Sequence, residues 1–470
     1  MEPGNLVEVS GIEVHRGRSM VLHEASLSLG KGEVIALIGE NGSGKSTLIE
    51  AISGIIPLRS GDVQWRLEND SNRTVRDSQG RRRPLPPMGL TLQKDGMCGE
   101  ETVIERIATA LSVSGLSHDE SILTRLLEEW GLSHRSKSRV AHLSSGLRRR
   151  LSVLSGIAPV ALSRPPRVSI LDEPSEGLDT ASKNLLGGWI RAMARNGHGV
   201  IIATHDKEVI QWADRVLEVC DSSLKESPGE SSGPELNLPK PLEMAGQTPI
   251  ASLMKWTISM EMRNPVDTVG RAVPAIVAIL LAYALVGSID PIDHGSNLLA
   301  ALVLAPPFIS AVTSPAISRR LSEEDCGRWW NANVGPISRP AFSIIGSSVI
   351  IPIPMAYFSW IVLAGSVDSQ VSIEVLKWLW LPAICMIDLA IAATSLHLLA
   401  SDLSRPGAVS ASLLLIVLVW PFLELTEALS MIIDNGMQIT LQFNGPLVTC
   451  FFASLISALV WISAVLFPDT

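Results

Sequence analysis

The feature that most constrains this sequence is a glycine-rich loop that separates an apolar strand from a helix. Residues 34–38 are apolar and predict a strand, and the next nine residues read Gly-Glu-Asn-Gly-Ser-Gly-Lys-Ser-Thr. Glycines in such a loop let backbone N–H groups turn inward around phosphate oxygens, and the start of the following helix favours the same anions. The loop therefore predicts an α/β domain that holds a nucleotide by its phosphates.

The positions of this loop have separate expected roles. Lys45 can reach the β- and γ-phosphates, and the hydroxyl of Ser46 suits a Mg²⁺ ligand. The other positions are expected to surround the phosphates, and they are Gly39, Asn41, Gly42, Ser43, Gly44 and Thr47. ATP and Mg²⁺ are the expected ligands.

A second predicted strand supplies the acids that such a site needs. Residues 168–171 are mostly apolar and are followed directly by Asp172 and Glu173. Asp172 would hold Mg²⁺ through water, and Glu173 would orient and polarise the water that attacks the γ-phosphate. The two acids therefore predict hydrolysis of the bound nucleotide.

A third motif narrows the class of nucleotide-hydrolysing protein. Residues 143–150 read Leu-Ser-Ser-Gly-Leu-Arg-Arg-Arg, and with the two motifs above they form an ordered series over residues 5–219. The series resembles the ATPase of the ABC transporter family. It also includes Gln93, a turn that ends at Asp179, and His205 after a predicted strand. The resemblance implies an α/β P-loop ATPase domain.

The resemblance also implies roles for individual residues. Gln93 would sense Mg²⁺ and the membrane domain, His205 would contact the γ-phosphate, and Asp179 would lie at a dimer interface. Ser144 and Gly146 match signature residues that bind the γ-phosphate held by an opposing subunit. Hydrolysis is therefore expected to need two ATPase domains, in a homodimer or in a heterodimer with a related subunit.

Three positions depart from the family pattern. The signature usually reads Leu-Ser-Gly-Gly-Gln, whereas this chain has Ser145 and Leu147 at the third and fifth places. The aromatic residue that usually stacks on adenine is replaced by His15 as the nearest candidate. His15 can be read equally as a platform for the base or as an exposed turn residue.

The composition changes beyond the ATPase motifs. Residues 221–249 are rich in Ser, Pro, Glu and Gly and predict a linker. Apolar stretches follow near 272–288, 297–316, 341–364, 378–400, 408–425 and 446–467. Each approaches the ~20 residues that cross a bilayer core, and six in succession exceed what a soluble domain could cover with polar surface. The expected division is an ATPase domain at 1–220 and an all-α domain of six membrane spans at 250–470.

The distribution of charge predicts the orientation in the membrane. Lys and Arg gather before the first stretch, between the second and third, and between the fourth and fifth. Such residues mark cytosolic loops, so we expect an integral protein of the cell membrane, in contact with lipid, with both termini cytosolic. The net charge of −9 offers no basic surface, and nucleic acid is not an expected partner.

The second half is similar to the compact type II exporter class. In that class a helix before the first span and a loop after the second contact the ATPase, and residues 252–263 and 321–331 suit these two roles. Three short stretches, at 261–265, 324–327 and 405–407, resemble the membrane subunit of the haem exporter of cytochrome c maturation. The resemblance implies a haem-related role with haem-handling membrane proteins as partners. An exporter of lipid, drug or another amphiphile, and an ATP-driven machine that releases partner proteins without moving a solute, remain the alternatives.

Overall fold

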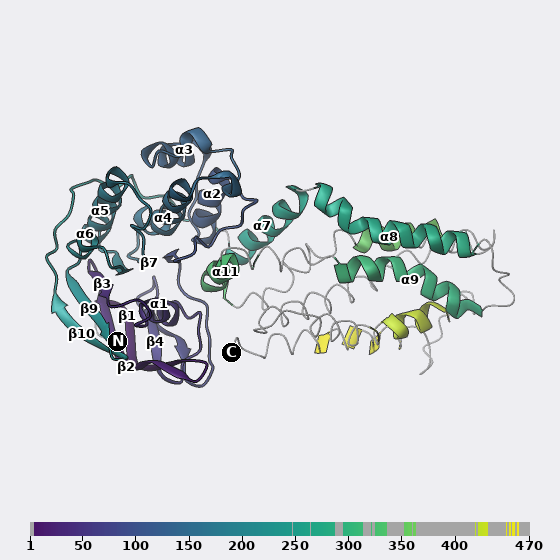
Figure 1. Cartoon of the computed structure of the whole chain (residues 1–470), viewed down its shortest axis with the longest axis horizontal. Coiled ribbons are helices and arrows are strands. Elements are labelled where there is room, and N and C mark those ends of the chain that lie inside the picture. The colour runs from purple at the N-terminus through teal and green to yellow at the C-terminus, as the bar shows by residue number, and fades with distance from the viewer. Residues whose placement is uncertain are drawn as a thin grey trace. The chain divides into compact units, whose positions relative to one another are not determined.

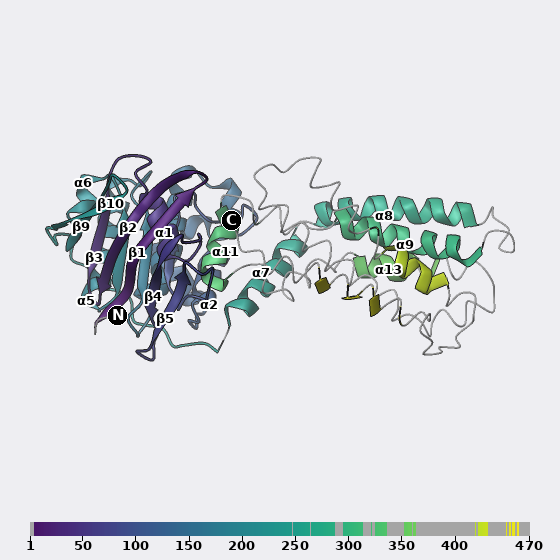
Figure 2. The same cartoon turned by 90° about the horizontal axis from the view of Figure 1, so that it is seen from below.

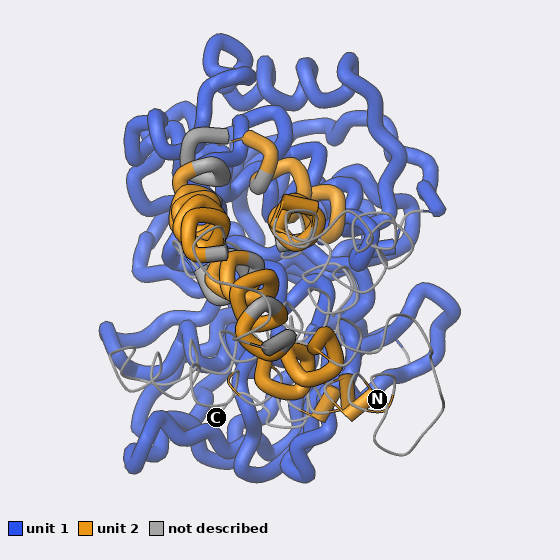
Figure 3. The backbone as a smooth tube through the Cα atoms, turned by 90° about the vertical axis from the view of Figure 1, so that its right-hand side faces the viewer, with its two compact units in different colours: residues 1–253, 320–337, 469–470 blue, residues 254–319, 338–468 orange. Residues whose placement is uncertain are grey.

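A computed structural model defines two compact units in the chain (Figure 3). Unit 1 comprises residues 1–253, 320–337 and 469–470, and unit 2 comprises residues 254–319 and 338–468. The structure describes residues 4–246, 248–263, 265–286, 295–313, 321, 325–335, 352–359, 361–362, 419, 422–430, 448, 451–452, 454–455 and 458–459. Each unit is considered by itself.

Unit 1 contains a mainly parallel sheet with the strand order β10-β9-β3-β8-β7-β6. Its strands are β3 (Val34–Ile38), β6 (Gly89–Thr91), β7 (Val168–Asp172), β8 (Gly199–Ala203), β9 (Arg215–Cys220) and β10 (Ser223–Pro228). Strands β7 and β8 are buried along their whole length. Such continuous burial requires a cover on both faces of the sheet, which explains why these strands read as apolar runs without alternation.

A second, antiparallel sheet of unit 1 has the order β2-β1-β4-β5. Its strands are β1 (Asn5–Arg16), β2 (Ser19–Gly30), β4 (Ser60–Arg66) and β5 (Asn72–Asp77). β1 and β2 form a long antiparallel pair (Figure 2). The alternation of buried and exposed residues along β1 is typical of a sheet with one covered face.

Helices of unit 1 connect and cover these strands (Figure 1). They are α1 (Lys45–Ile52), α2 (Val103–Val113), α3 (Glu120–Glu129), α4 (Ser145–Ala161), α5 (Thr180–Arg195), α6 (Lys207–Ile210) and α11 (Cys326–Val334). The sequence fixes several of their starts: Thr102 forms a capping box with Glu105 at α2, and the Asp119 carboxylate accepts from the N–H of Ile122 at α3. The α/β domain expected from the phosphate loop is therefore present.

The segment predicted as a linker differs from that expectation. Residues 223–228 form β10, which pairs with β9 at the edge of the sheet. The chain then follows the surface of unit 1, where the N–H of Leu242 donates to the Leu162 carbonyl at 2.8 Å and that of Ala245 donates to the Gly115 carbonyl at 2.7 Å. Backbone bonds to the domain, which leave no side-chain pattern, hold this polar segment in place. Unit 1 consequently extends past residue 220 to Leu253.

Beyond this segment, α7 (Pro249–Arg263) covers the helix expected at 252–263 and passes from unit 1 into unit 2. Unit 2 contains α8 (Pro265–Val286), α9 (Gly295–Thr313) and α13 (Pro352–Ser359). α9 packs against both α8 and α13, and the Ser359 hydroxyl on α13 donates to the Val303 carbonyl on α9 at 2.6 Å. The ring of Phe308 on α9 also lies 4.8 Å from that of Phe422, in the helical residues 422–430.

The predicted membrane spans lie mostly outside the described residues. α8 and α9 overlap the stretches at 272–288 and 297–316. The stretch at 378–400 is outside the described part, and those at 341–364, 408–425 and 446–467 are described only in short segments. Within the part of the chain that the structure describes, none of the helices combines the length and the apolar character that crossing a membrane requires.

Candidate functional site

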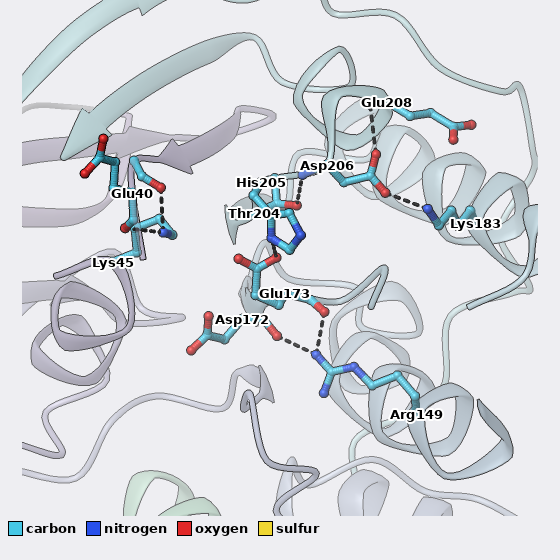
Figure 4. Close-up of polar contacts among 11 residues, drawn as sticks. Glu40, Lys45, Arg149, Asp172, Glu173, Lys183, Thr204, His205, Asp206 and Glu208 are labelled. Atoms are coloured by element: carbon cyan, nitrogen blue, oxygen red, sulfur yellow. Dashed lines mark hydrogen bonds and ion pairs between the residues drawn. The ribbon is translucent and has the colours of Figure 1, made fainter. Parts of the chain in front are cut away.

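The predicted chemical groups follow four neighbouring parallel strands. β3, β8, β7 and β6 lie next to one another in the sheet. The phosphate loop follows β3, His205 follows β8, Asp172 ends β7, and Gln93 follows β6. Because the carboxyl ends of parallel strands share one edge, the fold gathers these groups at that edge, where ligands of α/β sheets bind. Figure 4 shows several of them together.

Two glycines shape the phosphate loop. Gly39 has a φ of 146°, and a Cβ there would lie 2.7 Å from the Val219 carbonyl. Gly44 has a φ of 113°, and a Cβ there would lie 2.9 Å from Val21. Both positions thus need glycine for conformation and for space. Gly44 directly precedes the first turn of α1, so the loop ends with the free N–H groups of that helix.

Lys45 lies folded over this loop. Its ammonium donates to the carbonyls of Gly39 at 2.8 Å and Glu40 at 3.0 Å, and the residue is 7% exposed (Figure 4). The positive charge is therefore held directly above the backbone that the phosphates are expected to contact. The contact of Lys45 with the β- and γ-phosphates stays a prediction.

Asp172 occupies a buried position that suits a metal ligand. Burial raises the pKa of its carboxyl to about 6, and a hydrogen bond from Ser46 opposes this rise. The Oδ1 atom is buried, and no hydrogen-bond partner for it exists among the described residues. A buried carboxylate oxygen without a donor, beside a hydroxyl, fits Mg²⁺, which prefers hard oxygen ligands. Asp172 and Ser46 could therefore hold the metal.

Glu173 has an uncommon backbone conformation and is held by two contacts. Its backbone has a φ of 47°, its N–H donates to the Ala203 carbonyl at 2.9 Å, and its Oε2 lies 3.0 Å from Nδ1 of His205. The Glu173 carboxylate favours the protonated imidazole and so raises the pKa of His205. The pair brings the predicted catalytic acid and the predicted γ-phosphate sensor into direct contact (Figure 4). A contact of His205 with phosphate stays a prediction.

The segment that carries His205 is itself anchored. The N–H of Asp206 donates to the Thr204 hydroxyl at 3.0 Å, and the Asp206 carboxylate pairs with Lys183 on α5 at 2.7 Å (Figure 4). The chain direction after β8 is therefore set by α5, and this orientation turns His205 towards Glu173.

The signature residues begin a helix. Ser144 caps α4 by accepting from the N–H of Leu147 at 3.4 Å, and both Ser144 and Ser145 are exposed. Leu147, the departure from the family pattern, is half-buried and packs against the core of unit 1. At the position where the family pattern has glutamine, this chain therefore has an apolar side chain that contacts its own core.

Asp179 is also a helix cap. Its carboxylate accepts from the N–H of Ser182 at 3.0 Å and pairs with Arg150 at 2.7 Å, and the hydrogen bond from Ser182 lowers its pKa. The residue stays largely exposed. A free surface at Asp179 is compatible with the predicted interface, which stays a prediction.

His15 lies near the end of β1, where its Nε2 contacts Oε1 of Glu13 at 2.7 Å. The adjacent Arg16 pairs with Glu50 on α1, so this end of β1 lies beside the phosphate-loop helix. Both interpretations of His15 remain open, since the imidazole is partly exposed and bonded to one neighbour.

A helix from the second half of the chain packs on the cassette within unit 1. α11 overlaps the stretch at 321–331 that the sequence predicts to contact the ATPase, and its Trp329 ring covers the guanidinium of Arg106 at 3.9 Å. Arg328 pairs with Glu50 at 2.8 Å, and Arg82 donates to Asn331 at 2.8 Å. The expectation that this segment contacts the ATPase domain is thus met by specific partners that the sequence did not indicate.

Arg149 is the functional candidate that sequence reasoning missed. Its buried guanidinium donates hydrogen bonds both to the segment after β6 and to the end of β7. The arginine run at 148–150 was the only available signal, and it does not distinguish a buried arginine from an exposed one.

These features define a P-loop nucleoside triphosphatase of the ATP-binding cassette type. A sequence profile of the family described as ABC transporter matches residues 22–176. The putative hemin import ATP-binding protein HrtA of Staphylococcus haemolyticus is 32% identical over 209 residues, which cover 44% of this chain and 90% of that protein. The chain belongs to the ABC transporter family, and its first half is the ATP-hydrolysing cassette.

Other relatives have different names and lengths. A putative ABC transporter ATP-binding protein of Methanosarcina mazei is 29% identical over 47% of this chain, and the chain spans 43% of its length. The macrolide export ATP-binding/permease protein MacB of Azoarcus sp. is 31% identical over 49% of this chain, which spans 35% of it. A solved ATP-binding subunit of an ABC transporter is 26% identical over 47% of this chain and 90% of its own length, with a TM-score of 0.41.

Proposed function

We propose that this chain is the subunit of a dimeric ABC exporter in which an ATPase cassette and a six-span membrane domain are joined. The observation that carries the proposal is that the phosphate loop, Asp172 and Glu173 share one edge of the sheet, and that α11, a helix from the second half of the chain, contacts the same cassette at Glu50 and Arg106. A helix in this position ties the membrane half to the nucleotide site.

Hydrolysis follows from the arrangement of the side chains. The phosphate loop binds the phosphates through backbone N–H groups, and Lys45 moves its ammonium from the loop carbonyls to the β- and γ-phosphates. Asp172 and Ser46 would hold Mg²⁺, and the metal would supply positive charge beside the phosphate oxygens. Glu173 accepts a hydrogen bond from water and aligns it for attack, and His205 leaves Glu173 to contact the γ-phosphate.

The proposed dimer supplies the missing half of each site. Ser144 and Gly146 lie at the exposed start of α4, where a helix N-terminus favours an anion. We infer that they contact the γ-phosphate bound by the opposing subunit, with Asp179 at the same interface. A homodimer, or a heterodimer with a related subunit, would then bring together two cassettes.

The proposal of a membrane-spanning second half is based on the amino-acid sequence. Six apolar stretches, with Lys and Arg in alternate connections, support six spans with both termini on the cytosolic side, in contact with lipid. Several exposed apolar side chains of α8, including Leu280, Leu281 and Tyr283, support a lipid-facing surface on that helix.

We further propose that the cargo or partner is haem-related, in the manner of cytochrome c maturation. Support comes from the three membrane-half stretches at 261–265, 324–327 and 405–407. The cassette adds little support for a haem-related cargo. Relatives named for hemin import and for macrolide export match it about equally, at 32% and 31% identity. The alternatives are export of a lipid, drug or other amphiphile, and ATP-driven release of a membrane partner.

The test uses the full chain purified and reconstituted in liposomes. Glu173→Gln is expected to abolish ATP turnover while ATP binding is retained, because the amide keeps the shape but cannot polarise water. Glu176 is an exposed acid in the next turn, so Glu176→Gln is the control and should keep the wild-type rate of ATP turnover. Equal turnover of Glu173→Gln and wild type would refute the hydrolytic assignment.

Cargo is tested on the same proteoliposomes. Hemin is expected to stimulate turnover saturably, and a macrolide is not. Stimulation by the macrolide or by lipid alone would favour the general exporter, and the copurification of haem-handling membrane proteins without hemin movement would favour the release machine. Either outcome would contradict a haem exporter while leaving the ATPase intact.

A further inference from the structure

Arg149 lies on α4, five residues after the signature serine, and its side chain enters the interior of the cassette. The residue is 6% exposed. Its Nη1 donates to the Leu92 carbonyl at 2.8 Å and the Gln93 carbonyl at 3.4 Å. Its Nη2 donates to the carbonyls of Asp172 at 2.5 Å and Glu173 at 2.7 Å (Figure 4). One side chain thus joins both catalytic segments.

We propose that Arg149 is a positioning residue, which fixes the Gln93 segment and the carbonyl of Glu173 relative to each other and so aims the Glu173 carboxylate. The proposal rests on the role of Glu173 given above. It assigns Arg149 a role through the backbone, because Nη1 and Nη2 both donate to backbone carbonyls.

The backbone of Glu173 explains why such a bond matters. A φ of 47° is rarely adopted by a residue with a side chain and places the backbone of Glu173 under strain. The Ala203 carbonyl holds the N–H of this residue, and Arg149 holds its carbonyl. Without the second bond, the peptide after Glu173 can rotate towards an ordinary conformation, and the carboxylate moves with it.

Arginine is suited to this task by shape. Its planar guanidinium carries several N–H donors in a fixed fork, so two donors can face one segment while two face another. Lysine has a single ammonium, and glutamine has one amide nitrogen of shorter reach. Asp95, whose Oδ1 lies 3.6 Å from Nη1, balances the buried charge. Burial lowers the pKa of Arg149, but arginine keeps its proton at neutral pH.

The helix that carries Arg149 is pressed against the sheet. Gly156 lies two turns later on the same face of α4. The space beside it is so small that a Cβ there would lie 2.0 Å from Oγ1 of Thr91 on β6. Between the two, Ser152 donates to the Asp95 carbonyl at 3.0 Å. These contacts place α4 close to β6 and to the segment that follows it, which favours the bonds of the guanidinium to its carbonyls.

The experiment compares two buried arginines in the full chain. Arg149→Lys and Arg149→Gln are matched with Arg167→Lys and Arg167→Gln. Arg167 is 3% exposed and donates to the Pro159 carbonyl and to Glu68, but it lies at the opposite end of β7 from Asp172. Steady-state ATPase kinetics give kcat and KM, binding of a fluorescent ATP analogue gives affinity, and thermal unfolding gives stability.

We expect Arg149→Gln to lower kcat about tenfold to a hundredfold, the range for a small misplacement of a catalytic group. ATP affinity should change less than about twofold, and Arg149→Lys should retain more activity than Arg149→Gln. The Arg167 variants should lose stability without this loss of kcat. If Arg149→Gln does not fold, the comparison of Arg149→Lys with Arg167→Lys decides in the same way.

Three results would overturn the proposal: unchanged kcat in the folded Arg149 variants, equal loss of kcat in the Arg149 and Arg167 variants, or a raised KM with kcat preserved. Glu173→Gln is measured alongside. An active Glu173→Gln protein would contradict the role of Glu173 itself, whereas an inactive one with normal Arg149 variants would contradict only the positioning role.

Discussion

Replacing Asp172 by Asn should stabilise the cassette while it abolishes ATP hydrolysis. The pKa of this carboxyl rises from 3.8 to about 6, mainly because of burial. Each unit of pKa corresponds to about 1.36 kcal/mol, so the ionised side chain costs the folded state about 3 kcal/mol at pH 7.5. Asn removes this charge and can still accept from the Ser46 hydroxyl. For a domain of this size, we expect the melting temperature to rise by about 6–12 °C at most.

The stability gain of Asp172→Asn should depend on pH in one direction. Because the folded-state pKa is raised, the penalty is fully present above about pH 6 and disappears as the pH falls towards 3.8, where the unfolded carboxyl is protonated too. The advantage of Asp172→Asn should therefore shrink from pH 7.5 to pH 4.5. Calorimetry of the full chain without nucleotide or metal measures this, with the cassette transition identified by its shift on ATP addition.

Asp119→Asn is the matched control. Its carboxylate is exposed, caps α3 and has a pKa lowered by the backbone N–H of Ile122, so its ionised form is not penalised by folding. This variant should gain no stability at any pH. A wild-type melting temperature for Asp172→Asn at pH 7.5, or a gain that is just as large at pH 4.5, would refute the reasoning from burial.

Three further predictions concern other parts of the cassette. The affinity of the ADP complex for Mg²⁺ should fall about tenfold per pH unit below pH 6, because Asp172 then binds a proton; titration at pH 7 and 5, corrected for Mg²⁺–ADP association in solution, checks this. Trp329→Ala should uncover Arg106 and speed hydrogen exchange of residues 326–334, with Trp329→Phe intermediate; equal exchange in all three proteins would contradict the contact. Gly156→Ala should cost about 1–3 kcal/mol by overpacking, whereas Gly246→Ala, with open space around it, should be neutral in thermal unfolding.

The local motifs were predictable because each is contiguous in the chain. The phosphate loop and the pair Asp172–Glu173 combine a strand pattern with the side chains that it delivers, so the pattern and the chemistry are read together. That their strands are neighbours depends on the sheet order, which no local pattern contains. Gln93 and His205 were predicted from the family resemblance and not from a local sequence pattern.

The features that escaped sequence reasoning use the backbone as their partner. Arg149 bonds to carbonyls at Gln93 and Glu173, which lie 56 and 24 residues away, and a carbonyl exists at every position whatever the side chain. The segment predicted as a linker is held in the same way, through carbonyls of Leu162 and Gly115. Such bonds leave no trace in composition or periodicity.

The contact of α11 with the cassette also has a kinetic consequence. Because α11 belongs to the same chain, its docking is an intramolecular event governed by an effective concentration that the connecting segments set. The stacking of Trp329 on Arg106 and the ion pair of Arg328 with Glu50 need only modest strength to keep the helix seated. Contacts of modest strength are expected to release faster than strong ones, so α11 could leave the cassette and return to it without being lost to solution.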